Sequence, residues 1–256
     1  MLREKKWLSM FLMVGQLLIV SVVYAQNEGD VCEGVLKGLN IPLEVSADTA
    51  ISSKYIWRGF TLDDDPVIQP GIYLSAYGFS ASVWGSFELQ SNDALSSSEV
   101  DYAFDYTRDF GSFSLSLGNV YYDFPAADAF SNELYFGAGL NTFLAPRLVF
   151  YHDYGREGDG GGDGQYLILS LAHSLPLGNK GITLDLGGHV GYNRYLFING
   201  EGGDAVFNIG ITIPLAQKMT FIPNVNYSIP FGALKAADDG NQDAKFYGGF
   251  KLAFCF

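Results

Sequence analysis

The residues of this chain that could carry acid–base chemistry are its three histidines, His152, His173 and His189. Asp185 shares an extended segment and a face with His189, and a carboxylate that orients an imidazole would favour a hydrolase. Four residues of extended chain separate the two by about 13 Å, which is too far for a hydrogen bond. No serine stands at a recognisable motif spacing from a histidine. The sequence therefore predicts a hydrogen-bonded histidine and no catalytic site.

Metal and phosphate chemistry have no better support in the sequence. The segment 157–164 reads Glu-Gly-Asp-Gly-Gly-Gly-Asp-Gly, whose oxygens and glycine turns could hold calcium. The ligand spacing of an EF-hand loop is missing, so a solvated loop is the preferred interpretation. Glycine-rich phosphate loops and clusters of cysteine and histidine are absent from the sequence. We predict no metal site and no cofactor.

The charge of the chain excludes another class of partner. It carries 15 Lys and Arg against 28 Asp and Glu, a net charge of −13. A polyanion would be repelled, and no basic cluster offsets this charge, so nucleic acid is not an expected partner. The 31 glycines, 16 tyrosines and 20 phenylalanines are typical of close-packed strands with aromatic residues at a lipid interface. A secreted soluble β-sandwich is the alternative for this composition.

The elements that must position any site are β-strands. In 181–195, apolar residues of one parity alternate with polar residues of the other, as Leu184 and Leu186 do with Asp185. A carboxylate is costly in hydrocarbon, so we expect the apolar parity to face lipid and the polar parity a lumen. The alternation is unclear in 147–155, where a bulge would shift it. Twelve strands are predicted, over 43–57, 66–77, 79–90, 99–109, 112–123, 132–143, 147–155, 165–176, 181–195, 204–214, 218–229 and 244–256.

The connections between these strands alternate in length. The short links are 77–79, 109–112, 144–147, 177–181 and 215–218, and the long ones are 58–65, 90–98, 124–131, 156–164, 196–203 and 231–243. An even number of strands, with short periplasmic turns at one end and longer extracellular loops at the other, is typical of bacterial outer-membrane β-barrels. The predicted fold class is therefore an all-β, transmembrane antiparallel barrel of about 12 strands.

Both ends of the chain agree with this class. Basic residues, an apolar run and small residues up to Ala25 predict a signal peptide over 1–25, with an uncleaved anchor as the alternative. The last strand closes on Phe254 and Phe256, and such an ending resembles the insertion signal of outer-membrane barrels. We predict a periplasmic tail over 26–42 and a barrel over 43–256, integral to the bacterial outer membrane.

The inward parity collects the charged side chains that could select solutes. Twelve strands enclose an interior between the filled barrels of eight strands and the open porins of sixteen or more. A polar conduit and a closed barrel whose polar groups satisfy one another both fit this interior. The lumen and selectivity candidates are Lys54, Arg58, Glu88, Asp101, Asp105, Glu133, Asp185, His189 and Lys251.

Acidic residues crowd the predicted long loops, including Asp63, Asp64, Asp65 and Asp204, whereas Arg147 and other basic residues stand near the short turns. A negative outer mouth would concentrate cations within a Debye length of about 8 Å. The sequence therefore predicts a weak preference for cations.

The chain has two cysteines, Cys32 in the predicted tail and Cys255 in the last strand. Closure of a barrel pairs the first strand with the last, which would bring both cysteines near one rim. A disulfide in the oxidising periplasm and two free thiols are both compatible with this placement, because a stretch of tail separates Cys32 from the barrel.

One stretch of the chain carries a resemblance to a known family. The segment 53–60 reads Ser-Lys-Tyr-Ile-Trp-Arg-Gly-Phe, and Gln-Pro-Gly at 69–71 and Ser-Val-Trp-Gly-Ser-Phe at 82–87 follow it. These residues resemble a family of uncharacterised bacterial outer-membrane or exported barrels with an early Tyr-x-aromatic-Arg-Gly motif. The resemblance implies no substrate. Applied to this chain, it places Tyr55 and Trp57 in the outer aromatic girdle and turns Arg58 toward the mouth.

The expected function is a narrow channel for small polar solutes with a weak cation preference. A structural or surface-interaction barrel without a pore is the alternative, and an outer-membrane lipid-modifying enzyme is the third interpretation. The expected partners are outer-membrane lipid and lipopolysaccharide, the barrel assembly machinery during biogenesis, and small solutes.

Overall fold

The computed structural model describes residues 34–36, 41–90, 99–156, 161–237 and 242–256. Within these residues, no helix is long and apolar enough to span a membrane. The strands are β1 (Gly34–Leu36), β2 (Ile41–Ser52), β3 (Tyr55–Trp57), β4 (Phe60–Asp63), β5 (Val67–Ala76), β6 (Phe79–Glu88), β7 (Glu99–Asp109), β8 (Phe113–Phe124), β9 (Ala129–Leu140), β10 (Arg147–Asp153), β11 (Gln165–Pro176), β12 (Thr183–Arg194), β13 (Glu201–Ala216), β14 (Met219–Gly232) and β15 (Lys245–Cys255).

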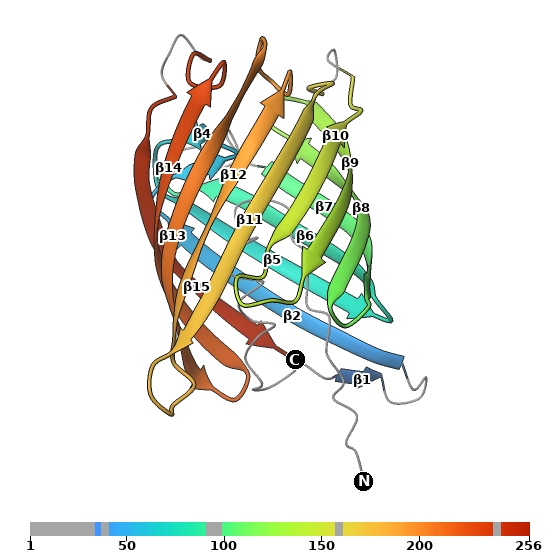
Figure 1. Ribbon diagram of the computed structural model, residues 1–256, viewed down its shortest axis with the longest axis vertical. Coiled ribbons are helices and arrows are strands. Elements are labelled where there is room, and N and C mark those ends of the chain that lie inside the picture. The colour runs from blue at the N-terminus through green and yellow to red at the C-terminus, as the bar shows by residue number, and fades with distance from the viewer. Residues whose placement is uncertain (1–33, 37–40, 91–98, 157–160, 238–241) are drawn as a thin grey trace.

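Twelve of these strands, β2 and β5 to β15, close into an antiparallel barrel. Each strand pairs with its neighbour in the chain, and β2 pairs with both β5 and β15. Ile51 marks the closure, because it lies opposite Ile68 on one side and Phe250 on the other. Figure 1 shows the tilted strands around the barrel, with β1 and the C-terminus at the same end. The predicted fold class and strand number are confirmed.

The two faces of the barrel wall follow the predicted alternation. In β13, Phe207 and Ile209 are 62% and 55% exposed, whereas Asn208 between them is buried in the interior. The strand β10 also alternates without a bulge, contrary to the doubt that its sequence raises. Its inward residues Val149 and Tyr151 are apolar as well, because they contribute to a packed interior. A strand with two apolar faces cannot show a period of two in hydropathy.

The connections keep the predicted asymmetry in most places. At the end that carries the C-terminus, β5–β6 and β13–β14 are joined by two residues each, 77–78 and 217–218. At the opposite rim, the links 89–98, 154–164 and 233–244 are long. The predicted loop 124–131 is wrong in length, because β8 and β9 extend and leave only 125–128 between them. The loop 196–203 likewise shrinks to 195–200.

The largest departure from prediction lies after the first barrel strand. The predicted strand 43–57 begins two residues earlier, at Ile41, and ends at Ser52. The chain then forms a separate two-stranded hairpin from β3 and β4, which we call the inner hairpin. Figure 1 places β4 near the rim opposite the C-terminus.

The turn of the inner hairpin explains the Arg-Gly pair of the motif. Trp57 lies opposite Phe60, so that Arg58 and Gly59 alone form the turn, with φ of 48° and 81°. Two positive φ values are the signature of a type I′ turn, whose twist suits two short antiparallel strands. Gly59 is also required by space, because a Cβ there would lie 2.6 Å from Cβ of Asp204 and 2.7 Å from Cδ2 of Leu234.

The inner hairpin packs inside the barrel. Tyr55, Ile56, Trp57 and Phe60 are all less than one-tenth exposed. The prediction that Tyr55 and Trp57 belong to the outer girdle is therefore wrong. They pack in one cluster with inward residues of the wall and with side chains of the links at the same rim, namely Val67, Trp84, Val120, Tyr122, Tyr135, Val149, Tyr151, Tyr166, Ile168, Leu196, Ile198 and Leu234.

The strand β15 ties the C-terminus to the start of the barrel. The backbone N–H of Phe256 donates to the carbonyl of Val45 at 3.1 Å. Cys255 takes part in a disulfide. Cys32, the other cysteine of the chain, lies outside the described residues, as do the predicted signal peptide and most of the tail, so the pairing of the two cysteines stays a prediction.

Candidate functional site in the barrel interior

A buried ion pair joins the inner hairpin to the barrel wall. Nη1 and Nη2 of Arg58 donate to Oε1 and Oε2 of Glu133 at 2.6 and 2.7 Å. Both side chains are buried, with exposed fractions of 8% and 0%. The hydroxyl of Tyr122 also donates to Oε2 of Glu133, at 2.7 Å. Parallel hydrogen bonds between guanidinium and carboxylate are the strongest form of this contact.

Aromatic rings enclose the guanidinium of Arg58. Its Cζ lies 4.4 Å from the ring centroid of Trp57, 4.2 Å from that of Tyr151 and 4.6 Å from that of Tyr166. Rings at this distance attract a cation through their negative faces. Arg58 was predicted to turn toward the mouth, but it is directed into the interior and holds the inner hairpin against β9, β10 and β11.

The surroundings of Arg58 also fix its charge. Burial, the largest single influence, would by itself lower the pKa of the guanidinium, but Glu133, Tyr122 and Tyr151 together raise the pKa above its ordinary value. Arg58 is therefore permanently cationic, and Glu133 has a permanent partner. A buried charge that loses such a partner has no water to replace it.

A second polar chain runs from Tyr166 to His189. The Tyr166 hydroxyl donates to Oδ1 of Asp204 at 2.6 Å, and Oδ2 of Asp204 lies 2.8 Å from Nε2 of His189. Asp204 is 0% exposed and belongs to β13, so its assignment to an outer loop is wrong. The partner of His189 is thus on the next strand, a pairing that no spacing along one strand could reveal.

Two more buried acidic residues lie beside the inner hairpin. Glu99 and Asp101 of β7 are 3% and 5% exposed. Burial and, next, the charges of Glu99 and Asp101 raise the pKa of the Tyr55 phenol well above its ordinary value. Asp101 was among the predicted lumen residues. Glu99 was missed, although it lies two residues earlier on the same face of the strand.

The interior nearer the C-terminal end holds polar residues of β6 to β10. The Ser80 hydroxyl donates to Asp105. Nη2 of Arg147 donates to Oγ of Ser116 at 2.7 Å. Arg147 was expected only near a short turn, yet its side chain turns inward, where a Cβ at Gly137 would meet its Nη2 at 2.6 Å. Small inward residues thus make the room that this arginine occupies.

Asp185 and Lys251 also lie inside, as predicted. Asp185 accepts hydrogen bonds from the hydroxyls of Ser174, Thr183 and Thr212 at 2.8, 2.8 and 2.6 Å. Nζ of Lys251 lies 3.5 Å from Oδ2 of Asp48. These contacts satisfy the charges of both side chains across neighbouring strands.

Lys54 and Glu88 lie at the rim rather than in the lumen. Lys54 and Lys245 both approach Oδ1 of Asp64, at 2.6 and 2.9 Å, and Asp64 is 60% exposed. Glu88 offers a carboxylate oxygen within 4.8 Å of one from Asp63 and one from Asp65. The two predicted lumen candidates thus belong to charged groups around the base of the inner hairpin.

The Asp64 contacts predict a pH dependence of stability. Hydrogen bonds from Lys54 and then Lys245 lower the pKa of Asp64 from its ordinary value of 3.8. The stability that these contacts contribute is therefore complete above pH 3.8. It is lost as the pH falls through the lower pKa that Asp64 has in the folded state. In urea unfolding at several pH values, Asp64→Asn should be slightly less stable at neutral pH, as exposed pairs are weak. This difference should vanish in acid, and a difference that persists there would contradict the assignment.

Taken together, the inward-facing charges are mostly acidic. Among the residues that the structure describes, the inward carboxylates include Asp48, Glu99, Asp101, Asp105, Glu133, Asp153, Asp185 and Asp204, and the inward cationic side chains include Arg58, Arg147 and Lys251. Carboxylates thus outnumber cationic side chains among the inward residues that the structure describes.

The fold places this interior among known outer-membrane proteins. The solved structure named "KdgM porin" superposes with a TM-score of 0.54 and 13% identity, over 82% of this chain and 99% of that one. The structure named "NanC porin structure in rhombohedral crystal form" gives a TM-score of 0.51 and 7% identity, over 82% and 98%. At these identities the likeness concerns the fold, which is that of porin-like outer-membrane barrels.

The sequence comparisons identify a family. No curated protein matches the chain. The sequence profile described as "Bacterial protein of unknown function (Gcw_chp)" matches residues 37–227, which include the inner hairpin, Glu133 and the Tyr166–Asp204–His189 chain. The chain therefore belongs to the Gcw_chp family of bacterial proteins.

Proposed function

We propose that this protein is an outer-membrane channel, a narrow one for small polar solutes, with a weak preference for cations. The observation that carries the proposal is a closed barrel of twelve strands whose inward charges are predominantly carboxylates. Its fold is similar to that of two proteins called porins, KdgM and NanC. Carboxylates along a narrow path favour cations because the low-dielectric wall strengthens their field.

The inner hairpin is the constriction of this channel. It fills the interior near one rim and is attached by Arg58 to Glu133. A solute must pass between the hairpin and the wall, or the hairpin must move aside. The wild-type conductance is therefore expected to be small for a barrel of this size.

Planar-bilayer recording of the refolded mature protein tests the proposal. Discrete current steps are expected, and in an asymmetric KCl gradient the reversal potential should give a potassium-to-chloride permeability ratio above one. The Asp185→Asn variant should lower this ratio, since it removes one inward carboxylate. A ratio below one, or a ratio indifferent to the variant, would contradict cation selection by the lumen.

A closed structural or surface-interaction barrel is the second candidate. The aromatic cluster around Trp57 favours it, because rings such as Tyr135 and Tyr151 fill the interior with exposed fractions of 1% and 2%. Replacement of residues 55–63 by a short Gly-Ser link separates the two candidates. If the wild type carries no current and the replaced form does, the inner hairpin is a permanent plug.

The contacts of the histidines support the proposal that the protein is not an enzyme. Ser170 lies opposite His189 on the neighbouring strand, but its hydroxyl donates to the backbone carbonyl of Arg147 at 3.4 Å. Nδ1 of His173 donates to the backbone carbonyl of Phe143 at 2.8 Å. A lipid-modifying enzyme would need a nucleophile beside one of these rings.

The setting and partners follow from the same class of barrel. The apolar outer wall suits the bacterial outer membrane, with lipopolysaccharide among its lipids, and a mature chain that begins after Ala25 crosses the periplasm to reach it. Phe254 and Phe256 at the end of β15 are the expected signal for the barrel assembly machinery. Replacement of both should slow membrane insertion without changing the contacts of the interior.

A further inference from the structure

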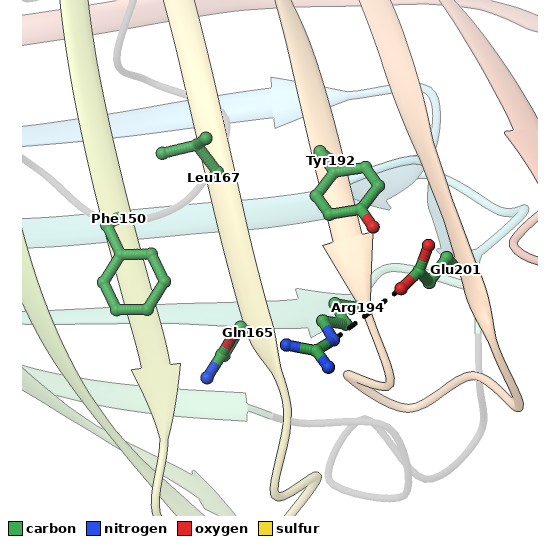
Figure 2. A pocket seen from close by; sticks show the side chains of 6 residues that line it. All are labelled: Phe150, Gln165, Leu167, Tyr192, Arg194 and Glu201. Carbon is green, nitrogen blue, oxygen red and sulfur yellow. Dashed lines mark ion pairs between the residues drawn. The ribbon is translucent and has the colours of Figure 1, made fainter.

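The outer wall has a pocket, but the charges that line it are already paired. The pocket has a volume of about 320 Å³ and lies at the ends of β10 to β13 farthest from the C-terminus. Figure 2 shows its side chains, in which Nε of Arg194 lies 3.7 Å from Oε1 of Glu201. The pocket therefore offers a ligand no unpaired charge, whereas the interior of the barrel does.

Arg147 is an inward cation without a carboxylate partner. Arg58 and Lys251, the other inward cations named above, each form an ion pair. Arg147 forms none with the residues that the structure describes, and its buried Nε has no hydrogen-bond partner there. Its Nη2 donates to Oγ of Ser116, which is a neutral group. The guanidinium has five N–H donors in all, so it retains donors for an anionic group.

Asp105 of β7 is the corresponding unpaired anion. Its side chain is directed inward and is 3% exposed. It forms no ion pair in the described part of the chain, and it accepts hydrogen bonds from the hydroxyls of Ser80 and Thr107. An ionised carboxylate has about four lone-pair positions, so Asp105 can accept further hydrogen bonds from a cationic group.

Two glycines show how far apart these charges lie. A Cβ at Gly118 would be 2.6 Å from Cβ of Asp105, and a Cβ at Gly137 would be 2.6 Å from Nη2 of Arg147. Gly137 lies opposite Ser116, which stands two residues before Gly118 on β8. Two residues of a strand span about 7 Å. The two charges therefore lie near one another without contact, and a small group fits between them.

Small residues leave this end of the interior less filled than the end that holds the inner hairpin. Near the hairpin, β8 and β9 direct large side chains inward, such as Tyr122 and Glu133. Arg147 and Ser114 are half-buried rather than enclosed, so solvent reaches this region from the rim that carries the C-terminus. The small inward residues here are Ser114, Ser116, Gly118, Gly137 and Gly139.

We propose that the interior between Arg147 and Asp105 binds small zwitterions such as α-amino acids. This inference rests on the proposed function as a channel and names the class of solute that passes through it. The carboxylate of the solute binds the guanidinium of Arg147, whose N–H donors match it in shape. The ammonium group of the solute binds the carboxylate of Asp105.

Charge complementarity favours this class of solute over a simple ion. An anion at Arg147 would also face Asp105, and a cation at Asp105 would also face Arg147, and each such encounter of like charges costs affinity. A neutral solute would leave both side chains without an ionic partner. A small zwitterion satisfies both of them at once.

Liposome swelling with the reconstituted mature protein tests the proposal. The two solutes are L-alanine and lactamide, which are isomers of the same size, but only alanine is a zwitterion. After subtraction of the rate in protein-free liposomes, we expect alanine to enter several-fold faster than lactamide. Arg147→Gln and Asp105→Asn should each reduce the rate for alanine to that for lactamide, because each removes one of the two ionic contacts.

Arg108→Gln is the matched control, because Arg108 lies on the same strand as Asp105 but is exposed on the outer wall. It should keep the advantage of alanine, and heat-modifiable gel mobility shows that each variant is folded. Equal rates for both solutes in the wild type would overturn this proposal and leave the channel in place. No swelling with either solute would overturn the channel, and this proposal with it. A loss of the advantage in Arg147→Gln but not in Asp105→Asn would also overturn the zwitterion site, since the ammonium group would then play no part.

Discussion

Replacement of Arg58 by alanine is expected to raise the single-channel conductance several-fold and to lower the free energy of unfolding by about 3 to 5 kcal/mol. The variant leaves Glu133 buried at 0% exposure without its bidentate partner, and it removes the cation from between Trp57, Tyr151 and Tyr166. The inner hairpin then has no polar attachment to β9 and should leave the lumen. Bilayer recording and urea unfolding measure the two effects.

Two further variants separate the ion pair from general damage. Arg58→Met with Glu133→Gln removes both charges, so most of the stability should return while the attachment stays weakened. Arg108→Ala, on the outer wall, should change neither conductance nor stability. If Arg58→Ala loses stability but conducts like the wild type, the inner hairpin is not the constriction of the channel.

Gly59→Val is expected to be the second most damaging change. The φ of 81° is in the left-handed region, which costs an L-residue about 1 to 2 kcal/mol. The side chain would also meet Asp204 and Leu234 at less than 3 Å, and overpacking of this kind costs about 1 to 3 kcal/mol more. The hairpin should therefore be displaced, with a loss of stability and a higher conductance.

Gly111→Val is the control for backbone strain alone. Gly111 has a φ of 86°, but no atom lies within 4 Å of the position where its Cβ would stand. It should lose stability only through the strained turn and should leave the conductance unchanged. Equal losses for the two variants would mean that the contact of Gly59 with Asp204 and Leu234 does not matter.

The strands of the barrel wall could be predicted because the alternation of residue types that defines them is a local property of the sequence. Lipid on one side and a polar interior on the other impose a period of two on each strand, as in Phe207 to Thr212. The same rule placed Asp101, Asp105, Glu133, Asp185 and Lys251 inside. Strand ends were less certain, since the residues at a rim meet water on both faces.

The inner hairpin was not predictable by that rule. Residues 53–57 continue the extended pattern of β2, so the sequence shows no break at Ser52. A type I′ turn usually carries Asn-Gly or Asp-Gly. Because Arg58 stands at the first position here, the sequence does not indicate a turn. The partners of Arg58 are 75 residues away, at Glu133, and in β10 and β11, a proximity that only the closed barrel creates.

Enclosure of the inner hairpin constrains the order in which this protein assembles. The seam between β2 and β15 joins the two extremes of the barrel sequence, so it is the contact with the greatest loss of chain entropy and is expected to form late. The inner hairpin follows β2 directly at one rim, but its partners Glu133, Tyr151 and Tyr166 belong to β9, β10 and β11, so it can dock only once those later strands are in place. The hairpin is early in the sequence but is among the last parts of the interior to be fixed.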